Sequence, residues 1–128
     1  TAELDNDAAQ QARELYWSVV AGEDMDPMQR LSYLDASANM NPYLAEPYVL
    51  LAQLRFALGD PAGAAQAADE ALSIFYTWGT CWDKRIPFRQ WVAFTRLLLL
   101  RAQRRLQGAM PALDLPLSPA GRVSLESI

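Results

Sequence analysis

The chain of 128 residues contains no histidine and one cysteine, Cys81. Imidazole is the commonest metal ligand and the usual general base near neutral pH, so its absence removes most hydrolase triads and most zinc sites. The sequence also lacks a Gly-rich phosphate loop and a nucleophile elbow. Neighbouring carboxylates such as Glu23, Asp24 and Asp26 have helix capping as their ordinary role. We therefore expect no enzymatic activity, no catalytic residue, no metal site and no cofactor.

Long apolar runs are also missing. The strongest candidate, residues 91–100, has half of the roughly 20 apolar residues that span a bilayer and contains Arg96. It is expected to be a helix in water, so we predict no membrane partner. A lone Cys81 forms no intrachain disulfide, which fits a reducing compartment, and we expect a cytoplasmic location.

Charge is distributed unevenly along the chain. Residues 1–46 contain nine Asp or Glu against two Arg, whereas residues 84–128 contain eight Lys or Arg against two acids. Either the two ends neutralise each other within one chain, or the chain pairs head to tail with a copy of itself. The net charge of −4 and the acidic first third argue against a nucleic-acid partner.

Helix punctuation repeats along the sequence. Asp26-Pro27 and Asp60-Pro61 lie 34 residues apart, and each pair opens an apolar run. Asp caps free backbone N–H groups, and Pro suits the first helical position. Leu31, Leu34, Ala38 and Met40 are followed at the same offset by Ala65, Ala68, Leu72 and Ile74. A period of about 34 residues is typical of helix-turn-helix repeats.

Residues 45–74 resemble one unit of the tetratricopeptide repeat family. The first helix of that unit is matched by Tyr48, Leu51 and Ala52, the turn by Gly59-Asp60, and the second helix by Ala64, Ala68 and Ala71-Leu72. Residues 27–40 resemble the second helix of a preceding unit, with residues 7–21 as its partner helix. Residues 87–107 resemble the first helix of an incomplete third unit, after an apparent insertion at 77–87.

The resemblance implies an all-α fold of about five helices. It would be built from antiparallel helical hairpins of a short right-handed solenoid, with a long C-terminal helix. We expect one domain over residues 1–107. Residues 108–128, with three Pro, two Gly and three Ser, are expected to form an extended or disordered tail.

The same resemblance implies a peptide-binding groove along the first helix of each unit. Beyond Leu15 and Val19, its residues would be Val49, Gln53, Phe56, Arg89, Val92 and Arg96. Such a groove would take an apolar segment that carries an acid. It lacks the carboxylate clamp of chaperone-binding members. Alternatively, the last helix covers these positions.

Two further surfaces are candidates for recognition. The insertion places Trp78, Trp82, Lys84 and Arg85 close together, and aromatics beside cations make a good contact patch. We expect at least one of the two Trp to be in the core.

In the last helix, Phe94, Leu97 and Leu100 fall outside the apolar stripe, which suggests a dimer face. Alternatively, this helix only caps the domain, and its basic end suits a helix C-terminus.

The sequence therefore favours a non-enzymatic protein–protein interaction module, an adaptor or oligomerisation domain whose partner is a protein, a peptide or a second copy. Two alternatives stay open. One is an accessory or regulatory domain of a larger enzyme or regulator. The other is a helical bundle that binds an apolar small ligand between Trp17, Phe56 and Trp91.

Overall fold

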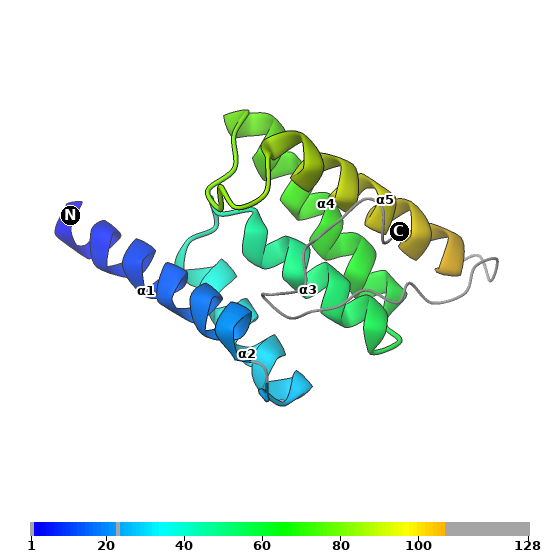
Figure 1. Cartoon of the computed structure of the whole chain (residues 1–128), viewed down its shortest axis with the longest axis horizontal. Helices are drawn as coiled ribbons and strands as arrows, with labels where there is room; N and C mark the ends of the chain where they lie inside the picture. The colour runs from blue at the N-terminus through cyan, green and yellow to red at the C-terminus, as the bar shows by residue number, and fades with distance from the viewer. Residues whose placement is uncertain (1, 23, 107–128) are drawn as a thin grey trace.

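The computed structural model describes residues 2–22 and 24–106, with side chains from Asp7 onward. The described residues form five α-helices and no strand, which confirms the predicted all-α fold (Figure 1). The helices are α1 (Ala2–Ala21), α2 (Pro27–Met40), α3 (Glu46–Ala57), α4 (Pro61–Trp78) and α5 (Phe88–Leu106). The tail expected at residues 108–128 lies outside the described residues.

Proline stands at the starts of α2 and α4, as the sequence predicted, but aspartate caps only α4, because the Asp26 side chain makes no capping hydrogen bond to α2. Pro27 and Pro61 are the first residues of α2 and α4, where a missing N–H costs no helical hydrogen bond. Asp60 caps α4, because its side chain accepts a hydrogen bond from the Gly63 N–H at 2.9 Å. At the other end of α4, Gly79 has φ of 68°, a left-handed conformation that suits glycine and ends the helix.

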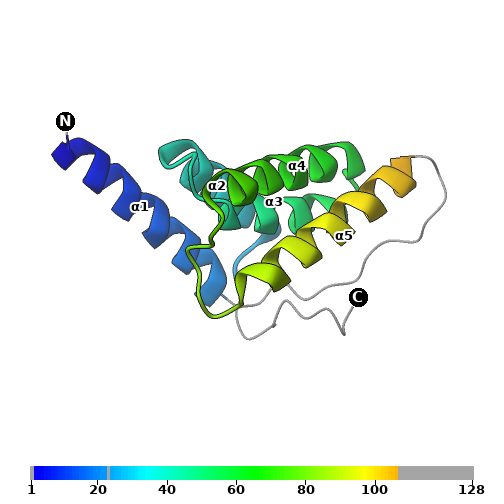
Figure 2. The same cartoon turned by 90° about the horizontal axis from the view of Figure 1, so that it is seen from above.

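Each helix packs against the next one along the chain, and α3 also contacts α5. Helices α1 and α2 form one pair and α3 and α4 another, while α5 lies against α4 (Figures 1 and 2). Among the described residues, α5 therefore has no hairpin partner of its own. None of the described helices combines the length and apolar character that a membrane span requires.

Small residues let α3 and α4 approach closely. Ala52 of α3 and Ala64, Ala68 and Ala71 of α4 have no exposed surface. Helices with alanine at their contact can pack at short interaxial distance, and larger side chains then fill the space to the sides. These are the alanines that carried the resemblance of residues 45–74 to a helical repeat.

Two buried polar side chains of α2 hold the first helix pair together. Arg30 donates to the carbonyls of Val19 and Met25, each at 3.1 Å, and also to that of Gly22. Ser37 donates to the Ala12 carbonyl at 2.6 Å. Because the last carbonyls of a helix lack internal donors, Arg30 acts as a cap for the end of α1.

Candidate functional site

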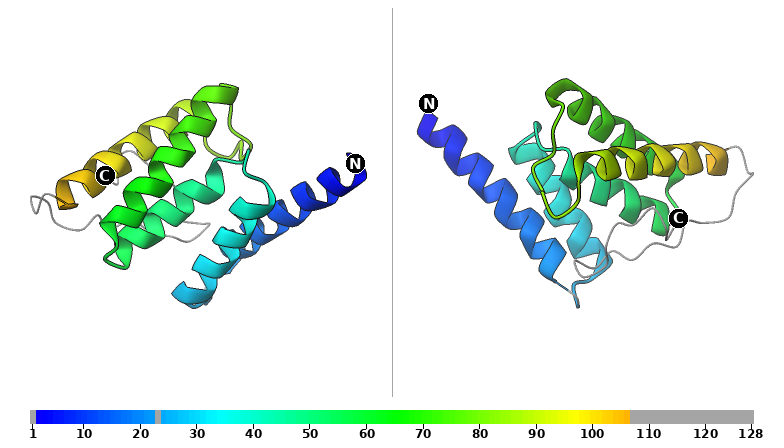
Figure 3. Two further views of the ribbon diagram at one scale, coloured as in Figure 1. Left: turned by 180° about the vertical axis from the view of Figure 1, so that it is seen from behind. Right: turned by 45° about the horizontal axis from the view of Figure 1, so that its top comes forward.

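Two acidic side chains, Glu46 and Asp83, are buried where α1, α3 and the α4–α5 loop (residues 79–87) meet. Figure 3, right, shows this loop between α1 and the start of α5. Glu46 is the first residue of α3, and its Oε2 accepts the backbone N–H groups of Trp82 and Asp83, both at 2.5 Å. The Tyr16 hydroxyl of α1 donates to Asp83 Oδ2 at 2.6 Å. The loop is thereby attached to two helices that are distant in sequence.

Asp83 makes further hydrogen bonds on its other sides. Arg85 donates from Nε and Nη2 to the carboxylate at 2.9 and 2.6 Å. The indole Nε1 of Trp91 donates to the Asp83 carbonyl at 2.9 Å. Because Trp91 belongs to α5, Asp83 connects α1, the loop and α5 at one point.

The surroundings raise the pKa values of Glu46 and Tyr16 and lower the pKa of Asp83. Burial raises the pKa of Glu46, because it outweighs the hydrogen bonds from the loop backbone. Burial also opposes ionisation of Asp83, but the hydrogen bonds from Arg85 and Tyr16 outweigh it and lower its pKa. The pKa of Tyr16 is raised by burial and by the neighbouring Asp83. This arrangement holds an ionised Asp83 against a neutral Tyr16 and keeps the loop in place.

An aromatic cluster covers this polar junction. The rings of Tyr16, Trp17 and Trp82 lie in mutual contact, with centroids 5.2 to 5.3 Å apart. Two cations lie over it: Arg85 stands 4.9 Å from the Trp17 ring, and Arg13 stands 5.6 Å from the Trp82 ring. Contacts of this kind stabilise by about 0.5–1 kcal/mol each at exposed sites, so they add to the packing of α1 on the loop.

Next to this loop lies a pocket of about 240 Å³, which we call the aromatic pocket. Its rim carries Tyr43 and Trp78, whose rings meet edge to face at 5.9 Å. Tyr43 is 68% exposed and Trp78 57%. Lys84 donates to Thr80 Oγ1 at 2.8 Å. The pocket is lined by Tyr43, Leu44, Ala45, Glu46, Ile74, Trp78, Thr80, Cys81 and Trp82.

Local backbone features hold the two rim aromatics in place. Tyr43 lies in the turn after α2, where its N–H donates to the Asn41 side chain at 3.2 Å. Side chain to backbone hydrogen bonds of this type are usual for Asn in turns. Trp78 is the last residue of α4, directly before the left-handed Gly79. Both aromatics therefore project from ends of elements that have defined conformations.

The single cysteine forms part of the pocket wall. Cys81 is buried, and its thiol donates to the carbonyls of Asp83 and Ile86, both at 3.7 Å. Burial raises the pKa of the thiol, so it is held in the protonated form. Cys81 acts here as a small packing residue that closes the loop.

The structure places the four residues of the expected recognition loop at different depths. Trp78 is exposed at the rim of the pocket, whereas Trp82 is half-buried and packs against the core. At least one of the two Trp was expected in the core; Trp82 packs against the core cluster without being fully buried, and Trp78 lies outside it. Lys84 is exposed beside Thr80, and Arg85 is committed to Asp83 and Trp17.

The residues expected to line a peptide groove differ in their solvent exposure. Val49, Gln53 and Phe56 of α3 are buried, as is Val19, while Leu15 and Val92 are half-buried. Arg89 and Arg96 of α5 are exposed. Only the arginines are open to solvent, and groove binding stays a prediction.

The expected dimer face requires a correction at Phe94. Phe94 is only 1% exposed and belongs to the core, whereas Leu97 is half-buried and Leu100 is 42% exposed. Phe94 follows Trp91 by three residues and precedes Leu98 by four, so all three share the buried face of α5. Phe94, Leu97 and Leu100 therefore do not form one exposed face.

The three aromatics considered for an apolar ligand make separate contacts. Trp17 belongs to the cluster above the polar junction. Arg105 lies over the ring of Phe56, and Trp91 contacts Phe75. Each is already packed against other side chains.

Sequence reasoning did not identify Glu46 or Tyr43 as site residues. An acid at the start of a helix ordinarily interacts with the helix dipole in solvent, so Glu46 gave no distinct signal. Tyr43 directly follows Asn41-Pro42, residue types that are typical of turns and that give no signal of a binding site.

Within residues 7–22 and 24–106, no group of three or more His, Cys, Asp or Glu side chains could hold a metal ion. Comparison of the chain with protein-family models, with curated proteins and with solved structures found no match in any of the three. A functional proposal for this chain therefore depends on the geometry of its described residues.

Proposed function

We propose that this chain is a protein-binding module whose contact surface is the aromatic pocket. The observation that carries the proposal is the exposure of Tyr43 and Trp78 at the rim of that pocket. Large aromatics usually bury most of their surface, and exposed ones beside a concavity are typical of interaction sites. Trp and Tyr also dominate the binding energy of many protein interfaces.

The pocket favours a protein segment that inserts one apolar side chain. Its lining is mostly apolar, with Leu44, Ile74 and Trp82 among the wall residues. Lys84, held next to Thr80 at its edge, favours an acidic group close to the inserted side chain. This matches the kind of partner that the sequence suggested, an apolar segment that carries an acid.

The rigidity of the wall also supports binding. Glu46 and Asp83 fix the α4–α5 loop from below through hydrogen bonds to its backbone and side chains. A surface that is ordered before association loses less conformational entropy on binding. The resemblance of residues 45–74 to a family of interaction repeats points in the same direction.

Selection of binding peptides from a random library against the intact chain tests this proposal. We expect the selected peptides to share a large apolar residue near an acid. Replacement of Trp78 by Ala should weaken their binding at least tenfold, about 1.4 kcal/mol, in titration calorimetry.

Tyr76 offers a matched control. It lies two residues earlier in α4 and is 59% exposed, but it does not line the pocket. Y76A should therefore bind like the original chain. Equal binding by W78A and the original chain, or equal losses in W78A and Y76A, would contradict the proposal.

A further inference from the structure

A second surface of the molecule, distinct from the aromatic pocket, is formed by the exposed side of α5. This helix contains five Arg and no Asp or Glu. Its exposed residues include Arg89, Arg96, Leu100 and Arg104. At 100° per residue these four lie within about 80° of one another, on a strip about 22 Å long. We call this strip the basic face of α5.

The charges of the basic face are not neutralised within the described part of the chain. Arg89, Arg96 and Arg104 form no ion pair with another described residue. Helix α5 packs on α4 and α3, not on the acidic first helix pair. Among the described residues, these arginines are therefore not neutralised by acids of the same chain.

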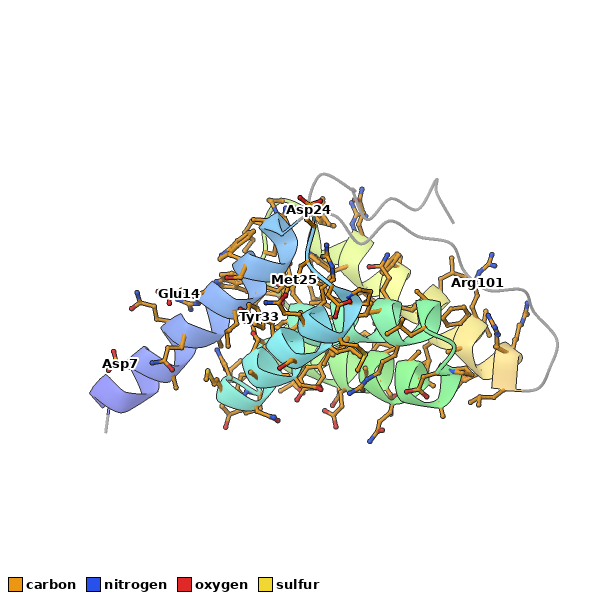
Figure 4. The ribbon with its side chains drawn as sticks, turned by 90° about the horizontal axis from the view of Figure 1, so that it is seen from below. Asp7, Glu14, Asp24, Met25, Tyr33 and Arg101 are labelled. Atoms are coloured by element: carbon orange, nitrogen blue, oxygen red, sulfur yellow. The ribbon has the colours of Figure 1, made fainter. Side chains whose placement is uncertain are left out.

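Helix α1 presents the complementary surface at the far side of the molecule. Asp7 and Glu14 are exposed and seven residues apart, which places them on one face of the helix. Figure 4 shows them along α1, with Asp24 in the turn after the helix. Arg13 is turned away from this strip, over the ring of Trp82. We call Asp7, Glu14 and Asp24 the acidic strip.

The charged residues of the two surfaces have matching spacings when α5 of one copy of the chain is set parallel to α1 of another copy. Asp7 opposite Arg89 places Glu14 opposite Arg96, since both pairs are seven residues apart. In the same register Leu100 faces Ser18, a small exposed residue, and Arg104 reaches the turn that contains Asp24. An antiparallel arrangement retains two of these charge pairs but carries Arg104 beyond the start of α1.

We propose that the chain associates head to tail with a second copy, the basic face of α5 of one copy docking on the acidic strip of the other. Helix α5, which has no hairpin partner of its own among the described residues, then gains a helical neighbour from the other copy. Pairing of two α5 helices is excluded as the contact, because it would set arginines against arginines. Since the two surfaces differ, the contact can repeat and give assemblies of more than two chains.

Light scattering at low and high salt tests the proposal. Exposed ion pairs are individually weak and are screened by salt. At about 0.01 M salt the Debye length is roughly 30 Å, and at about 1 M it is roughly 3 Å. We expect concentrated chain to show the mass of two or more copies at low salt and of one copy at high salt.

Charge reversal tests the pairing of Glu14 with Arg96. R96E and E14R should each raise the apparent dissociation constant at least tenfold, about 1.4 kcal/mol. The double variant E14R/R96E restores opposite charges across the contact and should associate again. The control Q66E/S73E changes the net charge by −2, as R96E does, at exposed positions of α4 seven residues apart. It should associate like the original chain.

Three results would overturn the proposal. A single-chain mass at low salt and high concentration would show that the surfaces do not meet. Association that is unchanged in R96E would place the contact elsewhere. Failure of E14R/R96E to associate, with helical content equal to the original chain, would refute this pairing. Loss of binding at the aromatic pocket would affect none of these results, because Trp78 and Tyr43 belong to neither surface.

Discussion

Glu46 illustrates how a residue's role depends on partners that are distant in sequence. As the first residue of α3 it stands where an acid usually interacts with free N–H groups of its own helix. Instead its carboxylate binds the backbone N–H groups of Trp82 and Asp83, and only 1% of its surface is exposed. Two buried N–H groups that would otherwise lack an acceptor are satisfied in this way.

The raised pKa of Glu46 predicts an effect of pH on stability. An acid whose pKa is higher in the folded state binds more protons folded than unfolded, so its contribution falls as pH rises above its ordinary value, 4.5. Glu46→Gln retains an acceptor but cannot ionise. The unfolding free energy of E46Q, relative to the original chain, should therefore increase as pH rises from about 4.5.

Urea denaturation across this pH range would measure the difference. Asp83 acts in the opposite direction: its lowered pKa adds stability that is lost as the pH falls below 3.8, the ordinary pKa of Asp. Because Asp83 is present in both E46Q and the original chain, its effect is common to the two. Glu70→Gln removes the same charge from an exposed position of α4 and controls for net charge. A constant difference between E46Q and the original chain at every pH would contradict the prediction.

At the scale of elements, α5 shows that a helix has a wider buried face than a single stripe suggests. The sequence predicts that one apolar stripe of this helix faces the core, made of Phe88, Trp91, Thr95, Leu98, Ala102 and Leu106. The four central residues are buried, whereas Phe88 is half-buried and Leu106 is 55% exposed. Phe94 is buried with the four central residues, because α5 contacts both α4 and α3. Because two helices pack against α5, more of its circumference is buried than a single neighbouring helix would cover.

The different burial of Phe94 and Leu100 predicts different costs of truncation. Phe94→Ala leaves a cavity in the core and should lower the unfolding free energy by about 3–5 kcal/mol. Leu100→Ala removes a largely exposed side chain, so its cost should stay near about 0.5 kcal/mol. Chemical denaturation of both variants would measure this, and equal costs would show that Phe94 is not a core residue.

At the scale of the whole molecule, the polar junction joins the first helix pair to the rest of the fold. Between α1 and the later helices, the contacts run through the α4–α5 loop, with Tyr16 bound to Asp83 and Trp17 packed on Trp82. Helix α2 adds its own packing on α3. One hydrophobic core cluster spans both parts, so the polar junction and this shared packing together couple the first helix pair to the later helices.

Tyr16→Phe tests this coupling with little change of shape. It removes the hydrogen bond to Asp83, which should cost about 1–3 kcal/mol because both groups are buried. Amide hydrogen exchange should accelerate in α1 and the loop more than in α4. Tyr76→Phe is the matched control, since it removes a hydroxyl from an exposed position of α4, and it should leave exchange in α1 and the loop unchanged. Equal acceleration in all helices of Y16F would indicate global destabilisation instead.

The helices themselves follow from local signals in the sequence. Asp-Pro pairs, the apolar period and the small residues of residues 45–74 predicted where helices start and which faces are buried, because these depend on capping and on spacing along one element. The predicted helix at residues 27–40 has the bounds of α2, and the expected one at about 87–107 differs from α5 by one residue at each end.

Only the tertiary structure decided the candidate sites. Glu46 and Asp83 lie 37 residues apart in sequence, and Tyr43 and Trp78, whose rings are in contact, lie 35 residues apart. No period or motif relates such positions, because their contact depends on how three helices and one loop pack together. The same reason applies to Arg96 and Glu14: the sequence determined that the chain is basic at one end and acidic at the other, but only packing determined that these charges face outward and remain apart.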